Sequence, residues 1–151
     1  MIKPLGNSEV KLDAKGRFLL PARYREILGD TVKEGFVLKR SIFKKCLELF
    51  TLENWEHESA MVNKLNMFKK KNSVFATQFM AGVRVVELDN SGRLLIPKDL
   101  LRYGGLTKNI VLTEINKRIE IWDKAEYERF IAEERDNFGD LAEEVMSDLD
   151  I

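Results

Sequence analysis

Short stretches rich in apolar residues, separated by turn residues, occupy the first third of the chain. In the first stretch Val10 and Leu12 share one face, as in a half-buried strand. Pro21 suits the first turn of a helix, and apolar residues follow it at helical spacing. The predicted elements are strands at 8–12 and 17–20, a helix from Pro21 with Tyr24, Ile27 and Leu28 inward and Gly29 as its cap, and strands at 35–40 and 46–50.

The same order of elements is predicted again after a helical connection. Thr51 or Asn54 can cap a helix that runs to about Phe68 and ends in three lysines, and residues 74–82 bridge to the next strand. The second set comprises strands at 84–88 and 93–96, a helix at 97–103 closed by Gly104 and Gly105, strands at 110–114 and 118–122, a helix at 125–137 with Tyr127, Phe130 and Ile131 inward, and an acidic tail that is frayed or helical.

One motif accounts for this recurrence. The stretch Leu12–Pro21 and the stretch Leu88–Pro97 both read Leu-Asp-x-x-Gly-Arg, then three apolar residues and a proline. The chain is therefore interpreted as a tandem duplication. A unit of roughly 45 residues buries too little surface to be stable alone, so the copies are expected to share one pseudo-twofold core. The boundaries drawn are 8–55 and 81–127 for the repeats, 56–80 for the connecting helix and linker, and 128–151 for the C-terminal helix and acidic tail.

Composition and charge refine this outline. The 151 residues are 44% hydrophobic and 33% charged, typical of one globular domain, and no apolar stretch is long enough to span a membrane. The N-terminus shows no signal-peptide pattern, and the single Cys46 fits a reducing cytoplasm. Residues 1–82 carry 15 basic and 9 acidic residues, whereas residues 83–151 carry 10 and 16, so only the first half suits a polyanion.

The titratable residues do not favour catalysis. His57 is the only histidine and lies between glutamates on a charged helix, which indicates a solvated surface position. Cys46 begins an apolar strand, as a buried inert thiol does. No metal-ligand spacing, Walker loop or dinucleotide fingerprint is found, so no enzyme, metal, cofactor or small-molecule substrate is expected.

The repeated motif is the best candidate for a binding site. Asp13 can accept backbone N–H groups, Gly16 permits the turn, and Arg17 is then presented at the edge of a strand. An arginine held in this way can bridge phosphates or reach base edges, and Lys15 adds a second cation. The alternative is that Asp13–Arg17, like the same pair in the second copy, is an internal ion pair that only fixes the turn. The two interpretations can coexist.

Residues 12–25 and 79–97 resemble the MraZ family over two copies of the motif in the same order. This resemblance implies an α+β, mainly β fold, in which two tandem AbrB-like β-β-α-β-β repeats exchange hairpins. They form one interlaced, double-psi-like barrel with flanking helices, and the subunits assemble into a ring oligomer. It also implies a sequence-specific DNA-binding transcriptional regulator, a repressor of the division and cell-wall gene cluster that binds short direct repeats in its own promoter in the cytoplasm and nucleoid.

Carried onto this chain, the resemblance assigns the site residues. The DNA contacts are Lys15, Gly16, Arg17, Gly92 and Arg93, and the residues that buttress the loops are Asp13 and Asp89. Arg23 and Arg25 are weaker candidates. Because Asn90 and Ser91 replace Ala14 and Lys15, and Leu101 aligns with Arg25, the first copy is expected to be the main reader.

Two other functions remain open at this point. One is a protein-interaction scaffold in which the rings or the acidic C-terminal helix bind a partner. The other is an AbrB-like antitoxin, which usually carries one copy of the fold and a disordered tail, so the internal duplication disfavours it. A scaffold would show no salt-sensitive DNA binding and no dependence on Arg17.

Overall fold

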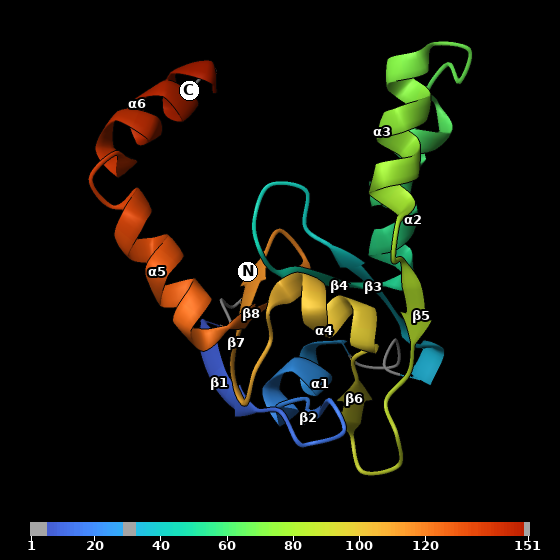
Figure 1. Cartoon of the computed structure of the whole chain (residues 1–151), viewed down its shortest axis with the longest axis vertical. Coiled ribbons are helices and arrows are strands. Elements are labelled where there is room, and N and C mark those ends of the chain that lie inside the picture. The colour runs from blue at the N-terminus through green and yellow to red at the C-terminus, as the bar shows by residue number, and fades with distance from the viewer. Residues whose placement is uncertain (1–5, 29–32, 150–151) are drawn as a thin grey trace.

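A computed structural model describes residues 6–28 and 33–149 and shows an α+β protein built mainly from antiparallel strands (Figure 1). The first half contains β1 (Asn7–Lys11), β2 (Arg17–Leu19), α1 (Ala22–Leu28), β3 (Phe36–Arg40), β4 (Leu47–Thr51), α2 (Leu52–Asn63) and α3 (Lys70–Met80). The second half contains β5 (Arg84–Val86), β6 (Arg93–Leu95), α4 (Lys98–Gly104), β7 (Asn109–Ile115), β8 (Arg118–Asp123), α5 (Lys124–Glu134) and α6 (Phe138–Asp148). The two halves thus repeat one order of elements, and the duplication predicted from sequence is confirmed.

The two repeats exchange strands. β1 of the first repeat pairs with β7 of the second, and β5 of the second pairs with β3 of the first. The neighbouring strands β4 and β8 join the two sets, which gives the order β1-β7-β8-β4-β3-β5. β2 and β6 pair only with each other as a two-stranded ribbon. When the repeats are interchanged, every pairing maps either onto another pairing or, for β2–β6 and β4–β8, onto itself. The fold therefore has the predicted pseudo-twofold, hairpin-swapped form.

The core lies between the large sheet and the ribbon. Phe18 and Leu94 point inward from the ribbon and are almost fully buried, together with Leu38 and Ile121 of the sheet. Tyr24 of α1 is also fully buried, as its helical spacing predicts. Because both repeats contribute to this one cluster, neither can form a core without the other. The side chains of Ile27 and Leu28 and the predicted cap Gly29 lie outside the described residues.

The connection between the repeats differs from the prediction of one helix to Phe68 and a bridge at 74–82. Thr51 caps α2, because its hydroxyl accepts the N–H of Asn54 at 3.1 Å. α2 then ends at Asn63. Asn66 forms the turn that follows: its Oδ1 accepts the N–H of Phe68 at 3.0 Å. The lysines at 69–71 therefore begin α3 instead of ending α2, and the predicted bridge is largely helical.

The C-terminal region also departs from the prediction in two details. Asp123 caps α5, and Tyr127 and Phe130 pack on Trp122 as expected. Ile131, however, is 43% exposed, because α5 contacts the sheet only near its start. The acidic tail is helical within the described residues, where it forms α6. In the second repeat, β5 stops at Val86 and Leu88 makes only an isolated bridge with Leu94.

The ribbon offers a direct test of the shared core. Phe18→Ala should lower the free energy of unfolding by about 3–5 kcal/mol, because it removes a buried aromatic ring and leaves a cavity. The neighbouring Leu19 is 51% exposed on the opposite face, so Leu19→Ala should change it by only about 0.5 kcal/mol. Urea unfolding at one protein concentration measures both values. Equal effects of the two substitutions would show that the ribbon does not close the core.

Candidate nucleic-acid interface

The first copy of the motif forms a closed turn between β1 and β2. The N–H of Asp13 donates to the carbonyl of Arg17 at 2.8 Å, and the N–H of Gly16 donates to the carbonyl of Asp13 at 3.0 Å. Oδ1 of Asp13 accepts the N–H groups of Lys15 and Arg17, both at 2.9 Å. The Asp13 carboxylate thus satisfies two backbone N–H groups of its own turn.

The second copy repeats this geometry between β5 and β6. The N–H of Asp89 donates to the carbonyl of Arg93 at 2.9 Å, and that of Gly92 to the carbonyl of Asp89 at 3.0 Å. Oδ1 of Asp89 accepts the N–H groups of Ser91 and Arg93, both at 2.9 Å. The buttress role predicted for the two aspartates is consistent with these bonds, since each carboxylate holds the backbone of its own turn.

The turn glycines are held by the opposite repeat. Gly16 and Gly92 have φ of +86° and +80°, and both are buried. A Cβ at Gly16 would lie 3.0 Å from Cδ1 of Leu101, and one at Gly92 would lie 2.9 Å from Nη1 of Arg25. Because the open side of each glycine faces the protein, these residues set the turns; a direct contact of either with DNA stays a prediction.

The glycine carbonyls add a second link between the repeats. The carbonyl of Gly92 accepts the N–H of Leu20 at 3.1 Å, and the carbonyl of Gly16 accepts the N–H of Ile96 at 2.9 Å. Each bond ties the turn of one repeat to the residue that follows the ribbon strand of the other. The two turns are consequently fixed relative to each other by backbone bonds as well as by the core.

The ribbon places both arginines on its outer face. Pairing of β2 with β6 sets Arg17 opposite Leu95 and Leu19 opposite Arg93, while the residues between them point into the core. The outer face therefore carries two arginines and two leucines in a diagonal arrangement. Leu19 and Leu95 were not predicted as part of a site, although strand alternation places them beside the arginines once their inward neighbours are assigned.

The two arginines differ in their partners. Nε of Arg17 lies 2.9 Å from Oδ2 of Asp13, and the two side chains remain 30% and 36% exposed. Arg93 is exposed and forms no ion pair with any described residue. The internal ion pair considered above is thus present in the first turn and lacking in the second. Since Arg17 keeps its two Nη groups outside that pair, the aspartate buttresses an arginine that can still bind a ligand.

The remaining predicted cations have different surroundings: one is exposed, and two contact other parts of the protein. Lys15 is exposed at the first turn. Arg23 donates through Nη2 to the carbonyl of Asn7 and to the hydroxyl of Ser8, so it anchors α1 to β1. Arg25 packs on the second turn, as its contact with the glycine there shows.

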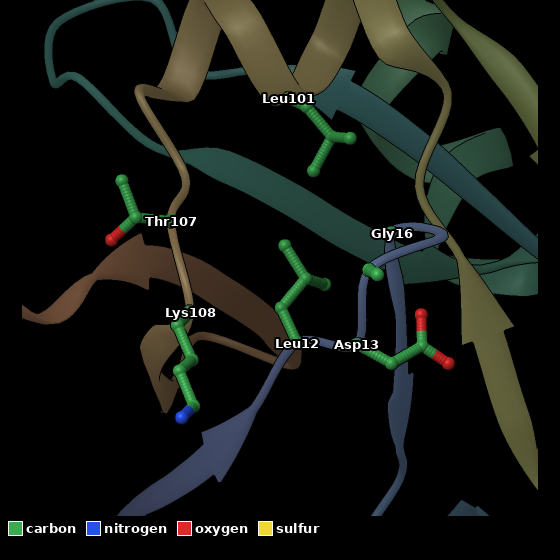
Figure 2. Close-up of a pocket in the computed structure, with 7 residues that line it drawn as sticks. Leu12, Asp13, Gly16, Leu101, Thr107 and Lys108 are labelled. Carbon is green, nitrogen blue, oxygen red and sulfur yellow. The ribbon is translucent and has the colours of Figure 1, made fainter.

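An open hollow lies beside the first turn, and Figure 2 shows the side chains of Leu12 and Leu101 pointing toward one another across it. Its volume is about 560 Å³, and Asp13 and Lys108 are the charged residues among those that line it. A catalytic pocket requires titratable groups that converge on one point, and the residues that line this hollow do not provide them.

The positions of His57 and Cys46 agree with the sequence analysis. His57 is exposed on α2, and burial raises the pKa of the Cys46 thiol to about 12, which leaves it unreactive. Within residues 6–28 and 33–149, no group of three or more acidic, histidine or cysteine side chains could hold a metal ion. No helix in the described part of the chain is both long and apolar enough to cross a membrane.

Two hairpin-swapped repeats, each with a buttressed Asp-x-x-Gly-Arg turn, define a tandem protein of the AbrB-like class. The chain matches the family described as "MraZ protein, putative antitoxin-like" over residues 5–77 and 79–148. It belongs to the MraZ family. The transcriptional regulator MraZ of Christiangramia forsetii is 47% identical over 150 residues, which are 99% of this chain and 97% of that protein.

Two further relatives carry the same name. The protein of Flavobacterium psychrophilum is 48% identical over 145 residues, or 96% of this chain and 92% of the relative. That of Bacteroides thetaiotaomicron is 37% identical over 150 residues, or 98% and 95%. These matches support a role in transcription regulation. The family match divides the chain near residue 78, whereas the finer domain boundaries drawn above stay a prediction.

The hydrogen bonds that buttress the turns predict a measurable decrease in the pKa of Asp13 and of Asp89. The N–H of Arg17 lowers the pKa of Asp13 below 3.8, assisted by its side chain, and the N–H of Arg93 lowers the pKa of Asp89 in the same way. Because the folded pKa lies below the unfolded one, this stabilisation of the turns is present above the unfolded value and is lost as pH falls through the folded value. Carboxyl ¹³C NMR titration should show both midpoints below 3.8.

Arg17→Ala supplies the control for that titration. It removes the side-chain bond but keeps the backbone bond, so the pKa of Asp13 should rise part of the way and the pKa of Asp89 should change less. A midpoint for Asp13 at or above 3.8 in the unmodified protein would contradict the buttress assignment.

Proposed function

We propose that the chain is a sequence-specific DNA-binding repressor that contacts promoter DNA through its two Asp-x-x-Gly-Arg turns. The observation that carries the proposal is the outward face of the ribbon, on which Arg17 and Arg93 lie together on a rigid support. Guanidinium groups bridge phosphates and bind guanine edges bidentately, and a fixed backbone keeps them in register. Lys15, exposed at the first turn, adds a phosphate contact.

The proposed target is a set of short direct repeats in the promoter of the division and cell-wall gene cluster. The gene for this protein is proposed to lie in the same cluster. A ring of subunits would set many turns in a row, and each box would then be bound at high effective concentration. Assembly also explains how a subunit with no net charge could bind DNA. A subunit with 25 basic and 25 acidic residues can present a positive strip where basic turns gather on one face.

A binding titration with DNA from upstream of the gene, beside scrambled DNA of equal length, tests this function first. The upstream DNA should bind more tightly, and a rise in salt from 50 to 200 mM should weaken binding by orders of magnitude as counterions are released (about 10³ or more for six contacts). Equal binding of both DNAs, or none, would instead favour a protein-interaction scaffold.

Substitution of the ribbon arginines assigns the contact. Arg17→Ala should abolish detectable binding to the upstream DNA, and Arg93→Ala should weaken it by about 5- to 150-fold, the range for one lost bidentate pair. Arg129→Ala is the matched control, because Arg129 is an exposed arginine on α5 whose one ion-pair partner among the described residues is Glu126. Binding is measured by fluorescence anisotropy.

The Arg17→Ala protein should keep its fold and its mass in light scattering. If it loses either, the Asp13–Arg17 pair is a structural element of the turn and the contact role fails. If it keeps both and still binds the upstream DNA as well as the unmodified protein, the assignment of Arg17 as the principal contact is wrong.

A further inference from the structure

A cavity of about 220 Å³ is bounded by the end of β3, the residues that follow this strand, α3 and α4. Three of its lining side chains are buried: Lys39, Ser41 and Phe79 are each at most 4% exposed. Ile42 and Phe75, which also line it, are 48% and 37% exposed. The cavity therefore combines a buried floor with a rim that is open to solvent and apolar.

Arg40 brings a positive charge to this cavity, and its partners are neutral. Its Nε donates to the carbonyl of Ala81 and its Nη2 to the carbonyl of Gln78, both at 3.1 Å. The guanidinium also lies over the ring of Tyr103, 5.0 Å from the ring centroid. Arg40 forms no ion pair with a described residue, and its Nη1 donates to none of them. A cationic group with free N–H donors thus lines the cavity.

Lys39 is the other charged residue that lines the cavity, and its charge is balanced. Its Nζ lies 3.7 Å from Oε1 of Glu48. The same carboxylate lies 3.4 Å from Nη1 of Arg118, and Nη2 of Arg118 pairs with Glu58 at 3.0 Å. Two cations and two carboxylates therefore offset one another behind the cavity. Arg40 is left as the one unbalanced charge among the residues that line it.

We infer that this cavity binds a small aryl carboxylate, with its carboxylate on Arg40 and its ring against the aromatic side chains of Phe75 and Tyr103. One unbalanced guanidinium matches one negative charge, and a carboxylate accepts N–H groups from it with good geometry. A phosphate monoester carries nearly two charges at neutral pH, more than the lining balances. The volume corresponds to about seven water molecules at roughly 30 Å³ each, which limits the ligand to a single ring.

The site requires the folded chain, because it joins elements that are distant in the sequence. The hydroxyl of Tyr103 donates to the carbonyl of Ser41 at 3.0 Å, and Arg40 connects β3 to the end of α3 through the bonds given above. A ligand that binds only this arrangement stabilises the folded chain. None of the residues proposed to contact DNA lines the cavity, so the inference goes beyond the proposed function.

A titration of the full chain with 4-fluorobenzoate, followed by ¹⁹F NMR without DNA, tests the inference. A ligand of this size should bind with a dissociation constant of about 1 mM or below. Benzoate should compete with it. Benzamide keeps the ring without the charge, and acetate keeps the charge without the ring, so each should compete at least about tenfold less well than benzoate because it loses one of the two interactions.

Gln78→Glu locates the ligand. Oε1 of Gln78 lies 3.5 Å from Nη2 of Arg40, so a carboxylate of the same shape at this position would neutralise the guanidinium and repel the ligand. The affinity for 4-fluorobenzoate should fall by about 10- to 150-fold, the effect of one lost charge-assisted hydrogen bond. Thr77→Glu is the matched control: it adds the same charge one residue earlier, at an exposed position that does not line the cavity, and should keep the affinity. Circular dichroism establishes that both variants are folded.

Three results would overturn the inference: no binding of 4-fluorobenzoate at about 10 mM, equal competition by benzamide and benzoate, or an unchanged affinity in folded Gln78→Glu. The competition measurements use the unmodified chain, so they decide the question even where the variant does not fold. Because DNA is absent from every measurement, the result is independent of the proposed function.

Discussion

The antiparallel pairing of β2 with β6 is the constraint on which the candidate interface depends. Each strand has only three residues and would not be stable alone. The pair persists because Phe18 and Leu94 are buried beneath it and because the glycine carbonyl of each turn accepts an N–H from the other repeat. Displacing the backbone of either arginine therefore requires opening the core, which explains how turns at the surface can hold a fixed geometry.

Within this frame the two turns have the same backbone and different surroundings. Arg17 is tied to its aspartate and Arg93 is not, while the glycine of the first turn is covered by Leu101 and that of the second by Arg25. The backbone bonds are equal because the aspartate and glycine recur in both copies. The surroundings differ because other positions have diverged, and each turn is covered by a helix of the opposite repeat.

Much of this arrangement could be predicted from the sequence. The motif repeat gave the duplication, the order of elements and the roles of Asp13 and Gly16 in the turn, since those roles depend on local chemistry. The exchange of β1 and β5 between the repeats could be predicted only from the family resemblance, because an alternating pattern does not identify the strand with which a strand pairs. The break after Asn63 was missed because the apolar pattern continues through it, while a side-chain bond at Asn66 redirects the backbone. Ile131 has helical spacing but lies past the point where α5 leaves the sheet.

The fusion of the two repeats in one polypeptide has a consequence for how the protein can change. A homodimer of single units must alter both of its turns with every substitution, because one codon specifies both. Here Lys15 and Ser91 occupy equivalent positions and are encoded separately, as are Arg25 and Leu101. One turn can thus be adjusted by mutation while the other stays constant, and the shared core, which both halves need, is the part of the duplication least free to diverge.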